Sequence, residues 1–323
     1  MLSDSVLVVG SVNLDVGYAL DRLPHPGETL RVAGRFVAGG GKGANQAMAA
    51  RQLGADVSLL ACVGPDASEA LADLQARGVE LSGLVRQDEV NTGTALLLSA
   101  RDDNCILIDA GANDLLGAED VRAYAQNHPQ PRVVVTNNEV PDDAVEAAVR
   151  SYAGRAIVVY NPSPTRELAE DLLEHVDLVV VNGAEAAALY GFAAAQITAE
   201  SVMDALEGSG VGDTVVTLGS AGVVVFADGV SSFVPAFRVD AVDTVGAGDA
   251  FLGALAAGIA SGDAVRASAV RAAAAAAITV TAEGARAAPL SPDSVDAFVH
   301  ERIVGARHPD CETSASSERR IQE

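Results

Sequence analysis

Short runs of aliphatic residues recur along the chain and alternate with longer alanine-rich stretches. Each run fills consecutive positions with valine, leucine or isoleucine, so both faces of the strand that it predicts are buried. The clearest strands are expected over residues 6–9, 57–62, 132–136, 156–160, 177–181 and 214–218. Such strands belong inside a sheet rather than at its surface.

Helical patterns separate these strands, for example over residues 142–151, 166–174 and 199–207. A sheet that is buried on both faces needs helices above and below it. The alternation therefore predicts an α/β fold with a doubly wound, mostly parallel sheet flanked by helices. The run 267–280 is mostly alanine but contains Arg271, which predicts a buried helix rather than a membrane span.

Two regions break this alternation. Residues 12–37 alternate apolar and polar positions around a Pro-His-Pro-Gly turn, and residues 91–109 hold two short strands around a charged turn. We expect them to form a small antiparallel β lid over the carboxyl edge of the main sheet.

Composition favours one large domain. The chain has 323 residues, of which 49% are hydrophobic, and this is enough to bury a large core. We expect residues 1–306 to form this domain. Residues 307–323 are polar and lack an apolar period, which predicts a flexible tail.

Charge and cysteine usage narrow the class of protein. A formal net charge of -23 repels nucleic-acid backbones and anionic membranes, so neither is an expected partner. Cys62, Cys105 and Cys311 show neither metal-ligand nor disulfide spacing, which suits a reducing compartment. The chain also begins without a signal-like apolar stretch. We therefore expect a cytoplasmic protein.

The strongest chemical signal is a glycine-rich segment before the helical pattern at 252–261. Gly246, Ala247 and Gly248 would let the backbone approach a phosphate, and the amides that open a helix favour an anion. Asp249 follows directly and could take a hydroxyl proton while these amides stabilise a transferring phosphoryl group. A tight turn with an acidic residue in the first helical turn would give the same pattern.

A second glycine-rich segment runs into a helix at residues 39–47. It is not a Walker A loop, because that motif needs a longer spacing and Ala44 occupies its hydroxyl position. The glycines could instead bring backbone amides against a polyhydroxylated ligand, with Lys42 or Asn45 adding side-chain hydrogen bonds. A helix N-terminus without a ligand is the alternative interpretation.

Three further segments follow predicted strands. Asn13 and Asp15 share one strand face and could hold adjacent hydroxyls, although turn chemistry explains them as well. Asn182 and Glu185 lie one helical turn apart and could organise the water shell of Mg²⁺. The glycine turn at 217–222 could lie along a nucleotide or simply join a hairpin.

Taken in this order, these segments resemble the ribokinase-like (PfkB) family of carbohydrate kinases over about residues 5–303. Segments 40–47 and 243–249 carry the two signatures of the family. Supporting matches are 10–15, 26–29, 109–113, 161–164 and the pair Asn182 and Glu185. The resemblance implies ATP-dependent phosphorylation of D-ribose at its 5-hydroxyl, with Asp249 as the general base.

The resemblance also implies the roles of individual residues. The anion hole comprises Gly246, Ala247 and Gly248, beside the catalytic Asp249. The residues implied to bind the sugar are Asn13, Leu14, Asp15, Gly41, Lys42, Gly43, Ala44, Asn45, Glu139 and Asp249. The residues implied to bind ATP are Asn182, Thr217, Leu218, Gly219, Ser220, Ala221, Gly222, Gly248, Asp249 and Ala273.

Metal ions and a second copy of the chain complete what the resemblance implies. Glu185 would organise Mg²⁺ through water, and K⁺ would act as a monovalent activator held largely by backbone carbonyls. The positions implied for K⁺ are Asp243, Val245, Thr279, Ala282, Gly284 and Ala288. Ala288 replaces a hydroxyl that is frequent in the family, and Ala273 replaces an Asn or His of the adenine pocket. The family also implies a homodimer formed through the lid.

Other functions would need different residues in these segments. The sugar could be 2-deoxyribose, a nucleoside or another furanose; the polar segment at 136–139 departs from the family pattern and leaves this choice open. A nucleoside kinase would need an aromatic platform for the base, and aromatic residues make up only 4% of the chain, with none inside these motifs. A non-catalytic sugar sensor would not need Asp249. A dinucleotide-dependent oxidoreductase would need Gly-x-Gly-x-x-Gly after the first strand, where Gly10-Ser11-Val12-Asn13 stands.

Overall fold

The structure is a computed structural model that describes residues 4–100, 104–166, 169, 171–191 and 197–305. Within these residues the large sheet has the strand order β13-β12-β11-β10-β9-β8-β1-β4-β5. Its strands are β1 (Ser5–Val9), β4 (Asp56–Val63), β5 (Leu84–Arg86), β8 (Val133–Asn137), β9 (Ile157–Asn161), β10 (Leu178–Asn182), β11 (Thr214–Thr217), β12 (Gly222–Ala227) and β13 (Val230–Pro235). All of its pairings are parallel except those of β12 with its two neighbours.

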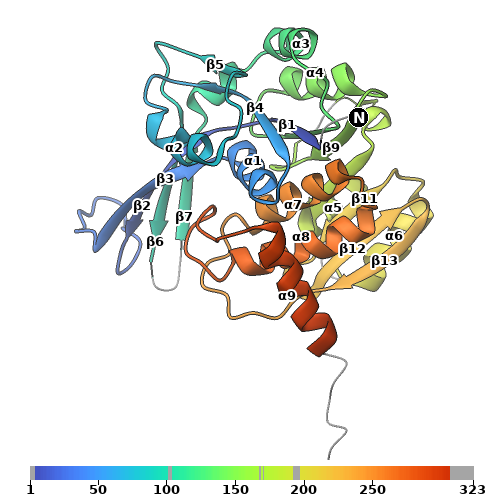
Figure 1. The fold of residues 1–323 in the computed structure, drawn as a ribbon. Coiled ribbons are helices and arrows are strands. Elements are labelled where there is room, and N and C mark those ends of the chain that lie inside the picture. The colour runs from blue at the N-terminus through green and yellow to red at the C-terminus, as the bar shows by residue number, and fades with distance from the viewer. Residues whose placement is uncertain (1–3, 101–103, 167–168, 170, 192–196, 306–323) are drawn as a thin grey trace, which may run out of the picture.

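Helices cover both faces of this sheet (Figure 1). Along β1, Val6 and Val8 face one core and Leu7 and Val9 face the other, as the two-residue period of a strand requires. The first core packs under α1 (Lys42–Gln52), α2 (Ser68–Arg77), α7 (Ala247–Ser261), α8 (Val265–Thr279) and α9 (Pro292–Gly305). The opposite face carries α3 (Ala118–Asn127), α4 (Asp142–Tyr152), α5 (Gly183–Tyr190) and α6 (Ala199–Ser209). The doubly wound fold predicted from the sequence is confirmed.

A second sheet, the lid, projects from the side of the domain (Figure 1). It consists of β2 (Asn13–Ala19), β3 (Gly34–Gly40), β6 (Gly93–Ser99) and β7 (Asn104–Asp109), in the order β3-β2-β6-β7. The outer pairings are antiparallel, whereas β2 and β6 pair in parallel because the two hairpins leave the main sheet in the same direction. The predicted segments 12–37 and 91–109 therefore do form one sheet.

One predicted helix is wrong. Positions 167, 168 and 170 lie outside the described residues, and the described part of 166–174 contains only a short 3₁₀ turn, Leu172–His175. Arg166 at its start is drawn toward the end of β8, where its guanidinium donates to the carbonyls of Asn138 and Val140. This tertiary contact outweighs the local helical pattern. The predicted tail at 307–323 also lies outside the described residues.

Small residues let three helices approach closely on one face. A Cβ atom on Gly253 of α7 would lie 2.4 Å from the Gln46 carbonyl of α1, and one on Gly258 would lie 2.6 Å from Ser268 Oγ of α8. The alanine-rich α8 is buried along most of its length, as predicted. The close contact of α1 with α7 brings the first turns of both helices together.

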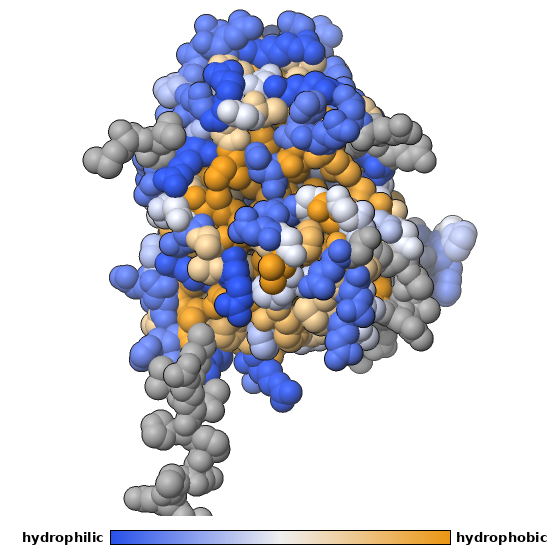
Figure 2. Space-filling model, turned by 90° about the vertical axis from the view of Figure 1, so that its right-hand side faces the viewer, coloured by the Kyte–Doolittle hydropathy of each residue, from blue (hydrophilic) through white to orange (hydrophobic). Residues whose placement is uncertain are grey.

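The side opposite the lid shows a patch of apolar surface (Figure 2). A hollow of about 580 Å³ lies at the amino ends of the central strands, beside the turn from α7 to α8, and Leu178 and Asp213 are among its lining residues. This hollow is far from the polar groups at the carboxyl edge. Among the helices of the described residues, none combines the length and apolarity needed to cross a membrane.

Candidate active site

The polar residues singled out in the sequence meet at one point of the sheet. β1 pairs with β4 on one side and with β8 on the other, so the chain reverses its winding direction beside β1, where ligands bind in open α/β sheets. Ser11 follows β1, Glu139 follows β8, and the Ser11 hydroxyl donates to Glu139 Oε2 at 2.5 Å. The candidate site lies at this edge, beneath the lid.

Asp249 is buried in the first turn of α7 and is held by two amides of α1. Asn45 Nδ2 donates to Asp249 Oδ2 at 3.0 Å, and Gln46 Nε2 donates to Oδ1 at 3.1 Å. Both donors lie in the first turns of α1, so the close packing of α1 on α7 sets their positions. The carboxylate is therefore fixed in direction.

A buried network extends behind Gln46. Asn137 Nδ2 donates to Gln46 Oε1 at 3.1 Å, and Asn137 Oδ1 accepts from the Glu139 amide at 3.1 Å. Gln46 and Asn137 are both fully buried. A buried polar group is costly unless it is paired, so this network fixes Asp249 and Glu139 relative to each other.

The N-termini of α1 and α7 differ in what their amides bind. In α1, the Lys42 amide donates to Glu139 Oε2, and the amides of Gly43 and Ala44 donate to Ser11. The expectation that these amides face a ligand is wrong, because the protein itself occupies them. The α1 glycines instead allow close packing: a Cβ on Gly43 would lie 2.6 Å from the backbone of Gly10 and Ser11.

In α7 the first amides are open. Gly246 caps the helix at φ 77°, a left-handed conformation that favours glycine. Within the described part of the chain, no acceptor pairs with the amides of Gly248 and Asp249, and a Cβ on Gly248 would meet nothing within 4 Å. The open amides at this end of α7, which includes Ala247, could therefore serve as the predicted anion hole.

Asp15 offers an unsatisfied carboxylate. Its Oδ1 is buried and has no hydrogen-bond partner among the described residues. Burial raises the pKa of Asp15 to about 6, although the nearby Arg286 cation lowers it and the charges of Glu139 and Asp249 add to the rise. A Cβ on Gly40 would meet this carboxylate at 2.1 Å, so any larger residue there would displace the Asp15 side chain. An unpaired buried acceptor is suited to a ligand hydroxyl.

Two neighbours of Asp15 in sequence are fixed by packing. Asn13 is buried, and its Oδ1 accepts from Asn113 Nδ2 at 2.8 Å. Asn113 also accepts from the Val12 amide at 2.9 Å, so it fixes the start of β2. Leu14 points the other way and packs against the main core.

Lys42 supplies a cation to the site. Burial alone would lower the pKa of the Lys42 ammonium. Neighbouring carboxylates outweigh burial and raise that pKa above its ordinary value, namely those of Asp249, Glu139 and Glu185. Lys42 is therefore charged and lies among the acidic groups of the site.

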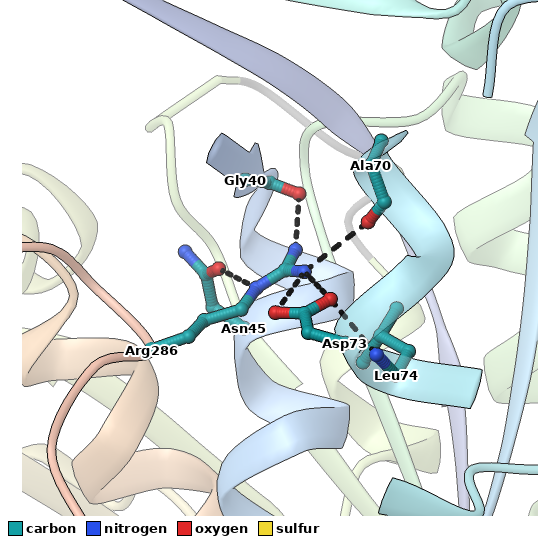
Figure 3. Close-up of polar contacts among 6 residues, drawn as sticks. All are labelled: Gly40, Asn45, Ala70, Asp73, Leu74 and Arg286. Carbon is teal, nitrogen blue, oxygen red and sulfur yellow. Dashed lines mark hydrogen bonds and ion pairs between the residues drawn. The ribbon is translucent and has the colours of Figure 1, made fainter. Parts of the chain in front are cut away.

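Arg286 was not predicted, and it joins several elements (Figure 3). Its Nε donates to Asn45 Oδ1 at 2.7 Å and one terminal nitrogen donates to the Gly40 carbonyl at 2.6 Å. The other terminal nitrogen contacts Asp73 at 3.0 Å and the Ala70 carbonyl. No local motif marks Arg286. Gln46, Asn113 and Asn137 lie in the segments 40–47, 109–113 and 136–139, but no role was predicted for them.

Several of the residues implied to bind ATP, among them Asn182 and Ser220, are exposed in turns along the same edge. Asn182 and Glu185 form a capping box at the start of α5: each backbone amide donates to the side chain of the other residue, at 2.8 and 2.9 Å. The pair thus has a structural role of its own. The segment 217–222 joins β11 to β12 through a 3₁₀ turn, Gly219–Ala221, and Ala273 is buried on α8.

The positions implied for K⁺ lie in two loops that contact each other. Asp243 accepts from the Gly284 amide at 2.9 Å and from the Val245 amide at 3.0 Å. Ala282 donates its amide to the Thr279 carbonyl at 3.2 Å. The Ala288 carbonyl already accepts from Gln52 Nε2 and from the Leu290 amide. Ala288 thus has the least capacity left for an ion.

The chain is similar to known carbohydrate kinases over most of its length. Residues 3–292 match the family described as pfkB family carbohydrate kinase. The ribokinase of Schizosaccharomyces pombe is 36% identical over 296 residues, which cover 87% of this chain and 93% of that protein. The deoxyribokinase of Salmonella typhi is 33% identical over 261 residues, covering 78% and 84%. The structure of Arabidopsis thaliana ribokinase complexed with ribose and ATP has a TM-score of 0.82 at 26% identity, covering 92% of this chain and 99% of that one.

The chain belongs to the pfkB family of carbohydrate kinases. It is therefore an ATP-dependent sugar kinase with the ribokinase fold. Below, the sugar side means four residues that were predicted to bind the sugar, Asn13, Asp15, Asn45 and Glu139. The nucleotide side means those predicted to bind ATP at Asn182, the 217–222 turn and Gly248.

Proposed function

We propose that this kinase phosphorylates D-ribose at its 5-hydroxyl, with Asp249 as the general base. One observation carries the proposal: the fixed, buried Asp249 carboxylate lies directly beside the open amides of Gly248 and Asp249. A base and an anion hole at one helix terminus suit the transfer of a phosphoryl group to an alcohol.

The proposed reaction is an in-line displacement. The ribose 5-oxygen attacks the γ-phosphorus while its proton passes to Asp249. The bond from the γ-phosphorus to the bridging oxygen of ATP breaks, and ADP leaves with that bonding pair. The amides of the anion hole stabilise the negative charge on the travelling phosphoryl group, and positioning by the buried network supplies much of the remaining rate.

The sugar side supports a ligand with several hydroxyls. The unpaired Asp15 Oδ1 can accept from one hydroxyl, and Asn13 and Glu139 lie beside it at the start of β2 and the end of β8. These are the polar groups that a free pentose requires, and several relatives are ribokinases. A deoxyribokinase is also among them, so 2-deoxyribose is the second candidate.

The residues present fit the ions that the family implies. Glu185 lies near enough to Lys42 for its charge to raise the pKa of that ammonium, and it would hold Mg²⁺ through water beside the phosphates of ATP. Among the described residues no three metal-ligating side chains gather, so the other ligands of Mg²⁺ would be water and phosphate oxygens. The Gly284 amide donates to the Asp243 side chain, so the two loops whose backbone carbonyls would hold K⁺ contact each other beside the turn that opens α7. Bound there, K⁺ would add positive charge beside the transferring phosphate.

The base assignment is tested by Asp249→Asn. This variant should bind ATP and ribose with nearly unchanged affinity but lose about 10²- to 10⁴-fold in turnover. Calorimetry measures binding, and coupled ADP release measures turnover. Near-normal turnover in Asp249→Asn would sink the base assignment.

The substrate is tested by a panel of ribose, 2-deoxyribose, fructose and a nucleoside with Mg-ATP, with and without K⁺. We expect the highest kcat/KM for ribose and activation by K⁺. Ribose binding without any ADP release would instead favour a non-catalytic sugar sensor. A preference for 2-deoxyribose would reassign the substrate while leaving the base proposal intact.

The lid supports a homodimer. β7 is an edge strand of the lid, and its residues Ile106, Leu107 and Ile108 are 51%, 55% and 63% exposed. An edge strand with consecutive exposed aliphatic residues is a pairing surface. Light scattering should show a dimer, and Leu107→Lys should yield a monomer; a monomeric unmodified chain would contradict this proposal.

A further inference from the structure

Arg286 lies in the loop that follows α8, close to the anion hole. The Gly284 amide, two residues earlier, donates to Asp243, and a Cβ on Gly246 would meet Ala285 at 2.5 Å. This loop therefore packs directly under the turn that opens α7. A side chain that anchors this loop therefore also helps to hold the turn that opens α7 in position.

From this loop the guanidinium reaches the opposite half of the site. The Arg286 side chain is only 6% exposed, and its donors reach α1 at Asn45, β3 at the Gly40 carbonyl and α2 at Asp73 (Figure 3). It thus bonds three elements that lie more than 200 positions away in the sequence. Gly39 makes room for it, since a Cβ there would lie 2.6 Å from a terminal nitrogen.

The contact with Asn45 has a direct effect on the base. Asn45 has one side-chain oxygen and one side-chain nitrogen, and Arg286 Nε occupies the oxygen at 2.7 Å. The amide group cannot then flip, so its nitrogen must point at Asp249 Oδ2, where it lies at 3.0 Å. The guanidinium determines which atom of Asn45 the base meets.

We propose that Arg286 is a positioning residue for phosphoryl transfer: it fixes Asn45, and through it Asp249, while joining the anion-hole loop to the lid strand β3. The proposal rests on the proposed role of Asp249 as the base. It also gives Arg286 an electrostatic role, because its cation lies near the buried Asp15.

The electrostatic role predicts a pH effect that packing alone would not produce. The charges that act on Asp15 are Arg286, Glu139 and Asp249, and only Arg286 lowers the pKa of Asp15. Loss of the cation should therefore raise this pKa further. Sugar binding needs ionised Asp15. The pH below which ribose no longer binds, called the acid limit below, should therefore be higher without the Arg286 cation than in the unmodified protein.

The test compares Arg286→Gln, Arg286→Lys and the control Arg51→Gln. Arg51 is a matched control because its guanidinium also bridges backbone carbonyls, those of Arg77 and Ala55, but lies away from the site. We measure kcat at saturating ribose and ATP, the melting temperature, and ribose affinity by calorimetry between pH 5 and 8.

Arg286→Gln should lose about 10²-fold in kcat and shift the acid limit of ribose binding upward. Arg286→Lys keeps the charge but not the planar fork, so it should restore the acid limit while kcat remains low. Arg51→Gln should lower only the melting temperature.

Two results would overturn the proposal. One is an Arg286→Gln protein that melts at a lower temperature but keeps the kcat and the acid limit of the unmodified chain. If Arg286→Gln does not fold, the second result applies: an Arg286→Lys protein with the kcat of the unmodified chain would also overturn the proposal. The acid limit of ribose binding is measured by calorimetry and does not depend on turnover. It therefore tests the electrostatic role of Arg286 even if Asp249 proves not to be the base.

Discussion

The sugar side and the nucleotide side of the site hold their polar groups in different ways. On the sugar side Asn13 and Asn45 are buried and hydrogen-bonded to other buried side chains. On the nucleotide side Asn182, Ser220 and Gly248 are exposed, and the contacts of their segments are local turns and caps. The polar side chains of the sugar side are thus held in position by the protein itself. On the nucleotide side the turns offer mainly backbone groups, which do not depend on the identity of the side chain.

This contrast is visible in the glycines of the two sides. Gly43→Ala should destabilise the protein by about 1–3 kcal/mol and abolish ribose binding, because its methyl group would meet backbone at 2.6 Å. Gly248→Ala should leave the melting temperature unchanged but lower turnover roughly 10-fold, since the methyl group would project into the anion hole.

Thermal melting and ADP release distinguish the two variants. Gly212→Ala is the control, because a Cβ there meets nothing within 4 Å and the residue lies outside the site. Gly43→Ala with normal melting would show that the sugar side is less tightly packed than the structure indicates.

The next largest effect concerns Asp15. Burial raises its pKa from 3.8 to about 6, so the ionised form is disfavoured in the folded state. Stability is therefore lost as the pH rises through about 6, and Asp15→Asn should stabilise the protein at pH 7.5 by on the order of 1–3 kcal/mol. The same variant should raise the KM for ribose about 10- to 100-fold, because the amide donates where the carboxylate accepts.

The pH dependence of the unmodified enzyme gives a second measurement. Its kcat/KM for ribose should fall as the pH drops below about 6, where Asp15 takes up a proton. Melting curves from pH 5 to 8, recorded for both proteins, supply the comparison. Equal stability of the two proteins at pH 7.5 would contradict the raised pKa.

The smallest effects are expected on the nucleotide side. Asn182→Ala removes one half of the capping box and should cost about 0.5–2 kcal/mol of stability. We expect a modest rise in the KM for Mg-ATP and no change in the KM for ribose. A large change in ribose affinity would mean that the two sides are coupled through α5, which the contacts do not indicate.

Sequence patterns located the fold and the local motifs because each depends on neighbours in the chain. The strands, the lid segments and the placement of Asp249 in a first helical turn all follow from local pattern. The partners of Asp249 do not: Asn45 and Gln46 lie 204 and 203 positions away from it. Arg286 in turn reaches Asn45 across 241 positions, and no pattern of nearby residues records these contacts. The predicted helix at 166–174 failed for the same reason, since Arg166 bonds to the end of β8 instead.

The two glycine-rich segments teach a related lesson. Both enter helices, and both predicted open amides. The amides of α1 are occupied by Ser11 and Glu139, whereas those of Gly248 and Asp249 are open. The sequence shows where glycines precede a helix. Which side chains accept hydrogen bonds from the amides of that helix depends on contacts that form only when the sheet is assembled.

β2 begins at the site with Asn13 and Asp15 and continues without a break into the lid as far as Ala19. The residues predicted to bind the sugar and the first lid strand therefore belong to one continuous β-strand, so a movement of the lid is coupled to a movement of these residues. We expect a sugar bound beside Asn13 and Asp15 to hold the lid over the phosphate, so that water is excluded there only while the sugar is bound. We accordingly expect this architecture to suppress futile ATP hydrolysis when no sugar is present.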